Sequence, residues 1–340
     1  MPDFASSRIL VPSTLRNLNI ILDAIVDRPS APCLGCVWGF AEFDPSSTAA
    51  EFDLPCGWRF YAQKLLNFAG IQLDYAEDGR DNAYDRVELG QSIIAAVDSY
   101  YLPYRPAWQR VHSARTLIVD RLAIDTGMAD IIDVWMPEYA GPIELSDLDH
   151  ARNSHVPENI EREPLYAGIP LRERWWTVAL VVDPLIRNHS GVMSRLSGLV
   201  SDAMSANTLG RMAKFRHGAV EALSRPLAIS GGARRAAALQ LRAEIGLRAY
   251  LYAFFNFASA ALDDQLFAAE VCLWSRQLDE LSGVRDLLIK SVAFDRPEYA
   301  QLADRALRSA EGRERRLTQF VDERCPQQAP DSIRAGGESC

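Results

Sequence analysis

Apolar residues recur with the period of an α-helix over much of the first part of the chain. In residues 13–27, STLRNLNIILDAIVD, leucine and isoleucine lie three and four positions apart, and the segment RPSAPC then breaks the pattern. A helical pattern resumes in residues 34–43, LGCVWGFAEF, and its first turn carries Cys33 and Cys36. A third helix is expected over residues 57–70, GWRFYAQKLLNFAG, because a glycine ends the pattern.

Beyond residue 86 the pattern changes to the shorter period of β-strands. Three short segments rich in β-branched residues, 93–100, 116–124 and 129–136, are expected to be strands. The sequence DTGM joins the last two and predicts a hairpin turn. The segment GPIELSDLDHARN follows, where we expect a short helix with Ser146 as its cap.

The second half of the chain shows helical patterns with few strand signals. Its longest pattern, from about 233 to 263, is apolar almost all round, which predicts the buried centre of a helical bundle. The expected fold class is therefore α+β, with an α+β domain over residues 1–165 followed by an all-α domain over 172–324. Residues 325–340 are rich in proline, glycine and serine, and we expect a flexible tail there.

Charge is distributed unevenly between the two halves. The chain of 340 residues has a formal net charge of −9, and residues 1–165 hold 25 Asp and Glu against 13 Lys and Arg. A nucleic-acid surface needs concentrated Lys and Arg, so we expect no nucleic-acid partner. No apolar run reaches the roughly 20 residues of a membrane span, and the first residues carry no secretion signal. We therefore expect a cytoplasmic protein with no membrane partner.

Six cysteines raise the question of metal or redox chemistry. Cys33 and Cys36 form a CxxC, but zinc needs further ligands, and the next cysteine, Cys56, has no partner at short spacing. A thioredoxin-like site needs a strand before the CxxC, whereas RPSAP precedes it here, and redox chemistry of the pair would require a reversible disulfide. A disulfide framework is not expected in an intracellular chain of this size. We expect neither a metal nor another cofactor.

A cysteine nucleophile is the other chemistry that these residues allow. In papain-like enzymes a cysteine at the start of a helix is followed, much later, by a strand hairpin with a histidine and then an orienting acid or amide. The helix N-terminus and a neighbouring imidazolium lower the pKa of such a cysteine. Here the order is Cys33 or Cys36, then His112, then Asp133. Each also has a structural interpretation: a buried thiol, a loop histidine, or a partnered acid. Asp98, which ends its strand, can simply cap the following loop.

The chain resembles a known family over nearly its whole length. The stretch VDSYYLPYRPAWQRVHSARTLIVDRLAI, followed by ADIIDVWMPEYAGPIELSDLDHAR, is similar to the N-terminal domain of the butirosin biosynthesis protein H family, and its Tyr-Tyr-Leu-Pro-Tyr block is the most specific part. The segment GGARRAAALQLRAEIGLRAYLYAFFNFASAALD resembles the helical domain that commonly follows. Members often carry a histidine just before the second strand, where this chain has Arg115, and His112 lies three residues earlier.

The resemblance implies a papain-like cysteine acyltransferase of natural-product biosynthesis. Such an enzyme moves an acyl group from a carrier-protein or coenzyme-A-type thioester to a small-molecule amine, or to water, through an acyl-cysteine intermediate. Cys33 or Cys36 would be the nucleophile, His112 the base and Asp133 the orienting acid. The residues expected to bind the substrate are Tyr100, Tyr101, Tyr104 and Arg115.

One alternative is a catalytically silent relative that serves as a scaffold for a partner. It predicts that no cysteine has unusual reactivity. In either case the net-basic helical half is where an acidic carrier protein would dock, with Arg234 and Arg235 as candidate contacts. The glycine pair before them, Gly231 and Gly232, is expected to break the helix.

Overall fold

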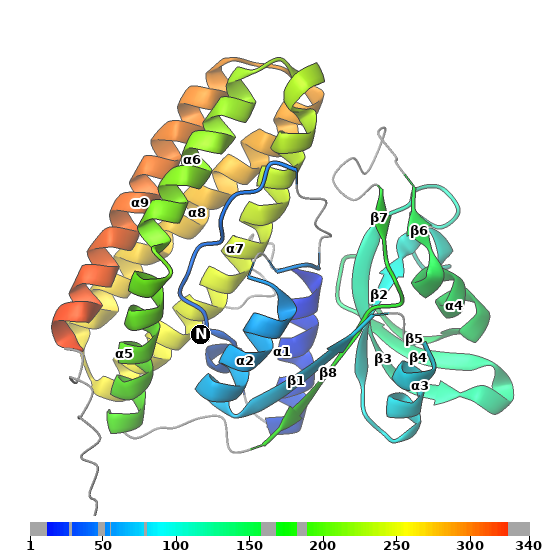
Figure 1. The fold of residues 1–340 in the computed structure, drawn as a ribbon. Helices are drawn as coiled ribbons and strands as arrows, with labels where there is room; N and C mark the ends of the chain where they lie inside the picture. The colour runs from blue at the N-terminus through cyan, green and yellow to red at the C-terminus, as the bar shows by residue number, and fades with distance from the viewer. Residues whose placement is uncertain are drawn as a thin grey trace, which may run out of the picture.

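The structure is a computed structural model in which a sheet-based region lies beside a bundle of long helices (Figure 1). The described residues are 12–26, 29–46, 52–54, 56–77, 80–157, 168–181 and 189–325. Helices of the sheet region are α1 (Ser13–Val26), α2 (Trp58–Ala69), α3 (Arg80–Glu88) and α4 (Leu145–Asn153), with 3-10 turns η1 (Ala31–Leu34), η2 (Ser99–Tyr101) and η3 (Ile124–Thr126). The bundle comprises α5 (His189–Ser205), α6 (Thr208–Ser224), α7 (Leu227–Leu262), α8 (Gln265–Ala293) and α9 (Glu298–Arg324).

One antiparallel sheet organises the first region. The strands are β1 (Ile71–Ala76), β2 (Ile93–Asp98), β3 (Ala114–Ala123), β4 (Met128–Asp133), β5 (Tyr139–Glu144), β6 (His155–Val156), β7 (Ile169–Pro170) and β8 (Trp175–Leu180). The six-stranded sheet has the order β1–β8–β2–β3–β4–β5, and β6 pairs separately with β7. The expected hairpin between β3 and β4 is confirmed, and Gly127 closes it in a left-handed conformation.

Both faces of this sheet are covered, which explains the continuous apolar run of β2. Ile94 and Ala96 belong to a core shared with α1 and α2. Ile93, Ala95 and Val97 belong to a second core, shared with α3 and α4. Successive residues of a strand point to opposite faces, so a strand that is covered on both sides is apolar at every position.

Helix α7 is the centre of the bundle, as its apolar sequence predicts. It packs against α5, α6, α8 and η1. The extended residues 35–44, here called the strap, lie across this helix and form part of the bundle core. Phe40 joins the cluster of α6, α8 and α9, and Trp38 joins the cluster of α5 and α7–α9. The strap thus ties the two regions together.

The prediction of a helix over residues 34–43 is wrong. Only the short turn η1 forms, and the strap that follows is extended. Trp38 and Phe40 are buried, whereas their neighbours are more exposed. Buried residues therefore recur every two positions, as in an extended chain, rather than every 3.6 as in a helix. The helix over 57–70 is confirmed as α2, ending at a left-handed Gly70.

The expected boundary at residue 172 is also wrong. Residues 175–180 form β8, which lies between β1 and β2 in the sheet, and the bundle begins only at His189. The glycine pair at 231–232 lies inside α7 and does not break it. Ser146 does not cap α4, because β5 extends to residue 144 and no side chain caps the helix. The tail at 326–340 lies outside the described residues.

Gly35 allows η1 to approach α7 closely, and we expect its replacement to loosen this contact. A Cβ atom at this position would lie 2.5 Å from the carbonyl oxygen of Tyr250 and 2.9 Å from Cβ of Phe254. Because backbone cannot move away as a flexible side chain can, Gly35→Ala is expected to cost about 1–3 kcal/mol of stability. Urea unfolding of this variant beside Gly232→Ala, where nothing lies within 4 Å, measures the effect. Equal midpoints for the two variants would contradict it.

Candidate functional site

The two candidate nucleophiles lie in the core beside α7. Cys33 belongs to η1 and Cys36 follows it, and their exposed fractions are 2 % and 1 %. Both pack in the cluster formed by α1, α2 and α7. Burial raises the pKa of the Cys36 thiol well above its usual range, because the thiolate would lose its solvation. At Cys36, burial therefore suppresses the ionisation that a nucleophile needs.

His112 is paired with a carboxylate, but with a different one from that expected. Its Nδ1 lies 2.7 Å from Oδ2 of Asp98, a fully buried side chain at the end of β2. Asp98 also accepts hydrogen bonds from the Tyr100 amide (3.0 Å), the Ser113 amide (3.0 Å) and the Ser154 hydroxyl (2.6 Å). The capping interpretation of Asp98 is therefore confirmed. Its second role, as the partner of His112, is not evident from the sequence.

Asp133 does not orient His112, and this expectation is corrected. Its Oδ2 lies 3.1 Å from the Arg105 guanidinium and 3.9 Å from Arg115, and it accepts a 2.9 Å hydrogen bond from the Tyr104 hydroxyl. Burial raises the pKa of Asp133, and the positive charge of Arg115 opposes this. The result is a buried ion cluster that joins β3, β4 and the loop after η2.

This cluster also engages two of the residues that were expected to bind the substrate. Tyr104 donates to Asp133 and stacks on Tyr139, with ring centroids 4.1 Å apart. Arg115 is turned toward the same carboxylate, with 18 % of its side chain exposed. By contrast, Tyr100 stacks on the His112 ring at 4.0 Å, and Tyr101 meets that ring edge-on at 6.2 Å. These two tyrosines flank the imidazole.

None of the described hydrogen-bond or ring partners of His112 is a cysteine. The helix that contacts β3 through its N-terminal end is α1, and its first residue, Ser13, lies against this strand. Thr116 donates to the Ser13 hydroxyl from its amide (3.2 Å) and from its hydroxyl (2.8 Å), and Asn17 donates to the Thr116 hydroxyl (3.1 Å). All three side chains are fully buried. Hydroxyls and an amide therefore occupy the helix–strand contact that a thiol and an imidazole would need.

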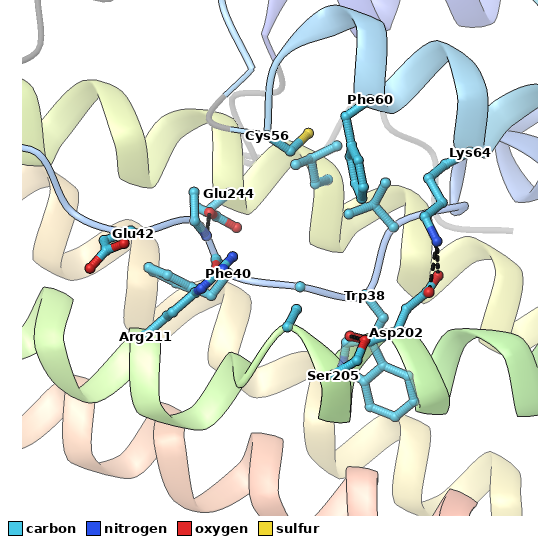
Figure 2. A pocket seen from close by; sticks show the side chains of 15 residues that line it. Trp38, Phe40, Glu42, Cys56, Phe60, Lys64, Asp202, Ser205, Arg211 and Glu244 are labelled. Atoms are coloured by element: carbon cyan, nitrogen blue, oxygen red, sulfur yellow. Dashed lines mark hydrogen bonds and ion pairs between the residues drawn. The ribbon is translucent and has the colours of Figure 1, made fainter.

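A cavity of about 530 Å³ opens between α2, the strap and the helices α5, α6 and α7 (Figure 2). Its volume is within the range of small-molecule sites, which often lie between domains. Phe60, Val37 and Leu247 give it apolar walls, and Cys56 presents its thiol at one edge. Burial raises the pKa of the Cys56 thiol to about 12, and the nearby Glu244 carboxylate adds to this. From the sequence, Cys56 was considered only as a metal ligand without a partner at short spacing.

Charged side chains enter the cavity from separate segments of the chain. Lys64 of α2 donates to both carboxylate oxygens of Asp202 on α5, at 2.7 and 2.6 Å (Figure 2). Glu244 of α7 accepts a 2.8 Å hydrogen bond from the strap at Ala41. Arg211 of α6 reaches the same strap. No local motif joins these residues, so no sequence pattern points to them.

The remaining expectations concern metals, membranes and docking. Among the described residues, no group of three His, Cys, Asp or Glu side chains could hold a metal ion. No described helix combines the length and apolar character that a membrane crossing requires. Arg234 is fully buried and bound to carbonyl oxygens and Asp295, so it is not a surface contact.

No family model matches the chain, and no curated protein shows significant sequence similarity to it.

Proposed function

We propose that this chain is a binding protein built on a papain-like sheet domain, and that it takes a small ligand in the cavity between α2, the strap and the bundle. The cavity carries this proposal. It has the size of a ligand site and both apolar and charged walls, whereas none of the described residues that line it is a histidine and its thiol is held protonated. Such a site has the means to bind and lacks the nucleophile–base pair of a thiol acyltransferase.

The strap gives the cavity a rigid floor. Glu244 accepts from the Ala41 amide, and Gln240 donates to the Ala41 carbonyl at 3.1 Å. Arg248 donates to the Gly39 carbonyl at 3.2 Å, and Trp38 donates to Glu314 at 2.7 Å. A floor held at successive residues loses little conformational freedom when a ligand binds, which favours affinity.

Thermal unfolding with and without small amphipathic probes tests the proposal. Octanoate, octanamide and octylamine share one apolar body and differ in charge, and at least one of them should raise the melting temperature. Ser205→Trp places a large side chain at the cavity wall and is the matched control, because Ser205 is exposed and lines the cavity. If no probe stabilises the wild type more than this blocked variant, the cavity is not a ligand site and the proposal fails.

Acyl transfer without a cysteine is a second candidate, favoured by the pair of His112 and Asp98. Since Nδ1 faces the carboxylate, Nε2 of the neutral imidazole is left to accept a proton. An acceptor amine would attack the thioester carbonyl directly, pass its proton to His112, and release the thiol that takes up this proton. The acyl donor would be a carrier-protein or coenzyme-A-type thioester.

Thiol release from acetyl and octanoyl N-acetylcysteamine thioesters distinguishes the two candidates. With a small amine present, the binding proposal predicts no release above the buffer rate, and no acyl adduct by intact mass. Release that falls at least a hundredfold in both His112→Ala and Asp98→Asn would instead establish the second candidate. The melting temperatures of both variants show whether they remain folded.

A further inference from the structure

We infer that the cavity selects an anionic amphipathic ligand, a small monocarboxylate with an apolar tail, and that Arg211 binds its carboxylate. This inference rests on the proposed function and adds the chemical class of the ligand. Its basis is the balance of charge around the cavity. A site with one unpaired cation prefers a ligand with one negative charge, because the charge of each then has an opposite charge beside it.

Each carboxylate that lines the cavity has a cation within ion-pair distance. Asp202 is bound through both oxygens by Lys64, at 2.6 and 2.7 Å. Glu42, at the outer edge, pairs with Lys214 at 3.1 Å. Glu244, the buried one, pairs with Arg248 at 2.7 Å, and Arg248 also lies 3.6 Å from Glu314. Each of the three carboxylates that line the cavity therefore has an ion-pair partner within the protein.

Arg211 is different from these cations. Within the part of the chain that the structure describes, its recorded contact is a 3.5 Å hydrogen bond to the Phe40 carbonyl, at the limit of such a bond. Among the described residues no ion pair includes Arg211, and the neighbouring carboxylate Glu42 pairs with Lys214. Arg211 is half-buried, and its side chain lies beside Phe40 at one end of the cavity (Figure 2). A guanidinium has five donors in a planar fork, so most of its hydrogen-bonding capacity is available to a ligand.

The fork and the apolar walls together define the ligand class. A guanidinium binds a carboxylate through two parallel hydrogen bonds, and one unpaired cation balances one such charge. A phosphate dianion would leave a second charge uncompensated. Beyond Arg211, the walls include Phe60, Val37 and Leu247, which offer apolar contact to a tail. A carboxylate at one end of an apolar chain satisfies both parts of the cavity.

Titration calorimetry with the three eight-carbon probes at pH 7.5 tests this assignment. Octanoate should bind the wild type at least tenfold more tightly than octanamide, and octylamine should bind most weakly. Arg211→Gln should lose about tenfold to a hundredfold in octanoate affinity and leave octanamide affinity unchanged. Arg225→Gln, which removes an exposed cation at the end of the same helix, should change neither.

The outcomes separate this inference from the proposed function. Equal affinity of the wild type for octanoate and octanamide would overturn the anionic class while the cavity remains a ligand site. Binding of none of the three probes would overturn both. The comparison of probes on the wild type does not depend on any variant, so the inference remains testable if Arg211→Gln fails to fold. Arg211→Lys should recover part of the affinity, because it restores the charge without the fork.

Discussion

Iodoacetamide at pH 7.5 should alkylate Cys56 about a thousandfold more slowly than an ordinary exposed thiol. The pKa of Cys56 is raised to about 12 by burial and by Glu244, whereas an unperturbed thiol has a pKa of about 8.5. The thiolate is the reacting form, so its fraction at pH 7.5 sets the rate. Because the pKa lies far above the working pH, the rate should rise about tenfold with each pH unit up to about pH 11.

Peptide mass mapping after timed alkylation measures each cysteine separately. Cys272 is exposed on α8 and serves as the internal control, which should react first. Cys33 and Cys36 should react only when the protein unfolds, at a rate limited by global unfolding, because both are almost fully buried. A papain-like nucleophile would behave in the opposite way, with rapid alkylation that persists below neutral pH. Such behaviour at Cys33 or Cys36 would contradict the binding proposal and restore the thiol mechanism.

The sheet could be predicted only in part, since some strands leave a clear trace in the sequence and others do not. The run IIAAV in β2 and the hairpin between β3 and β4 follow from local pattern alone. β8 lies directly before the helical half of the chain, and it pairs with β1 at residues 71–76, about a hundred positions earlier. Pairing over such separations leaves no local periodicity. The domain boundary was misplaced for this reason.

The partner of His112 was misjudged because the register of β3 and β4 decides it. Ile132 pairs with Ile118, so Asp133 lies beside the middle of β3 and reaches Arg115, whereas His112 precedes the strand. A register shift between residues 119 and 121 also changes the pairing of β3 with β4 by one residue. Asp98 pairs with Ala114 at the very start of β3, which brings its carboxylate to His112. Sequence order alone does not contain this register.

The strap illustrates why the cavity could not be predicted either. Its apolar residues Trp38 and Phe40 suit a helix as well as an extended chain, and what decides between them is the bundle beneath. The charged groups that complete the cavity come from α2, α5, α6 and α7, and they meet only because the strap holds the two regions together. Tertiary contacts here override local propensity.

The most destabilising single change in this junction is expected at Glu314 of α9. Its carboxylate is fully buried and accepts hydrogen bonds from Trp38 of the strap (2.7 Å), and from Trp274 (2.9 Å) and Gln277 (2.9 Å) of α8. Arg248 lies 3.6 Å away. Glu314→Ala would leave three buried donors without an acceptor and weaken the compensation of a buried guanidinium. We expect a loss of about 3–5 kcal/mol in the free energy of unfolding.

Urea unfolding measures this loss, with Glu323→Ala as the control, because Glu323 lies on the same helix but is exposed. The control should stay within about 0.5 kcal/mol of the wild type. Since Trp38 also lines the cavity, Glu314→Ala should weaken octanoate binding even under conditions where the variant remains folded. Equal stability of the two variants would mean that Glu314 does not hold the strap. Lost stability with unchanged octanoate affinity would mean that Glu314 stabilises the bundle core but does not affect ligand binding in the cavity.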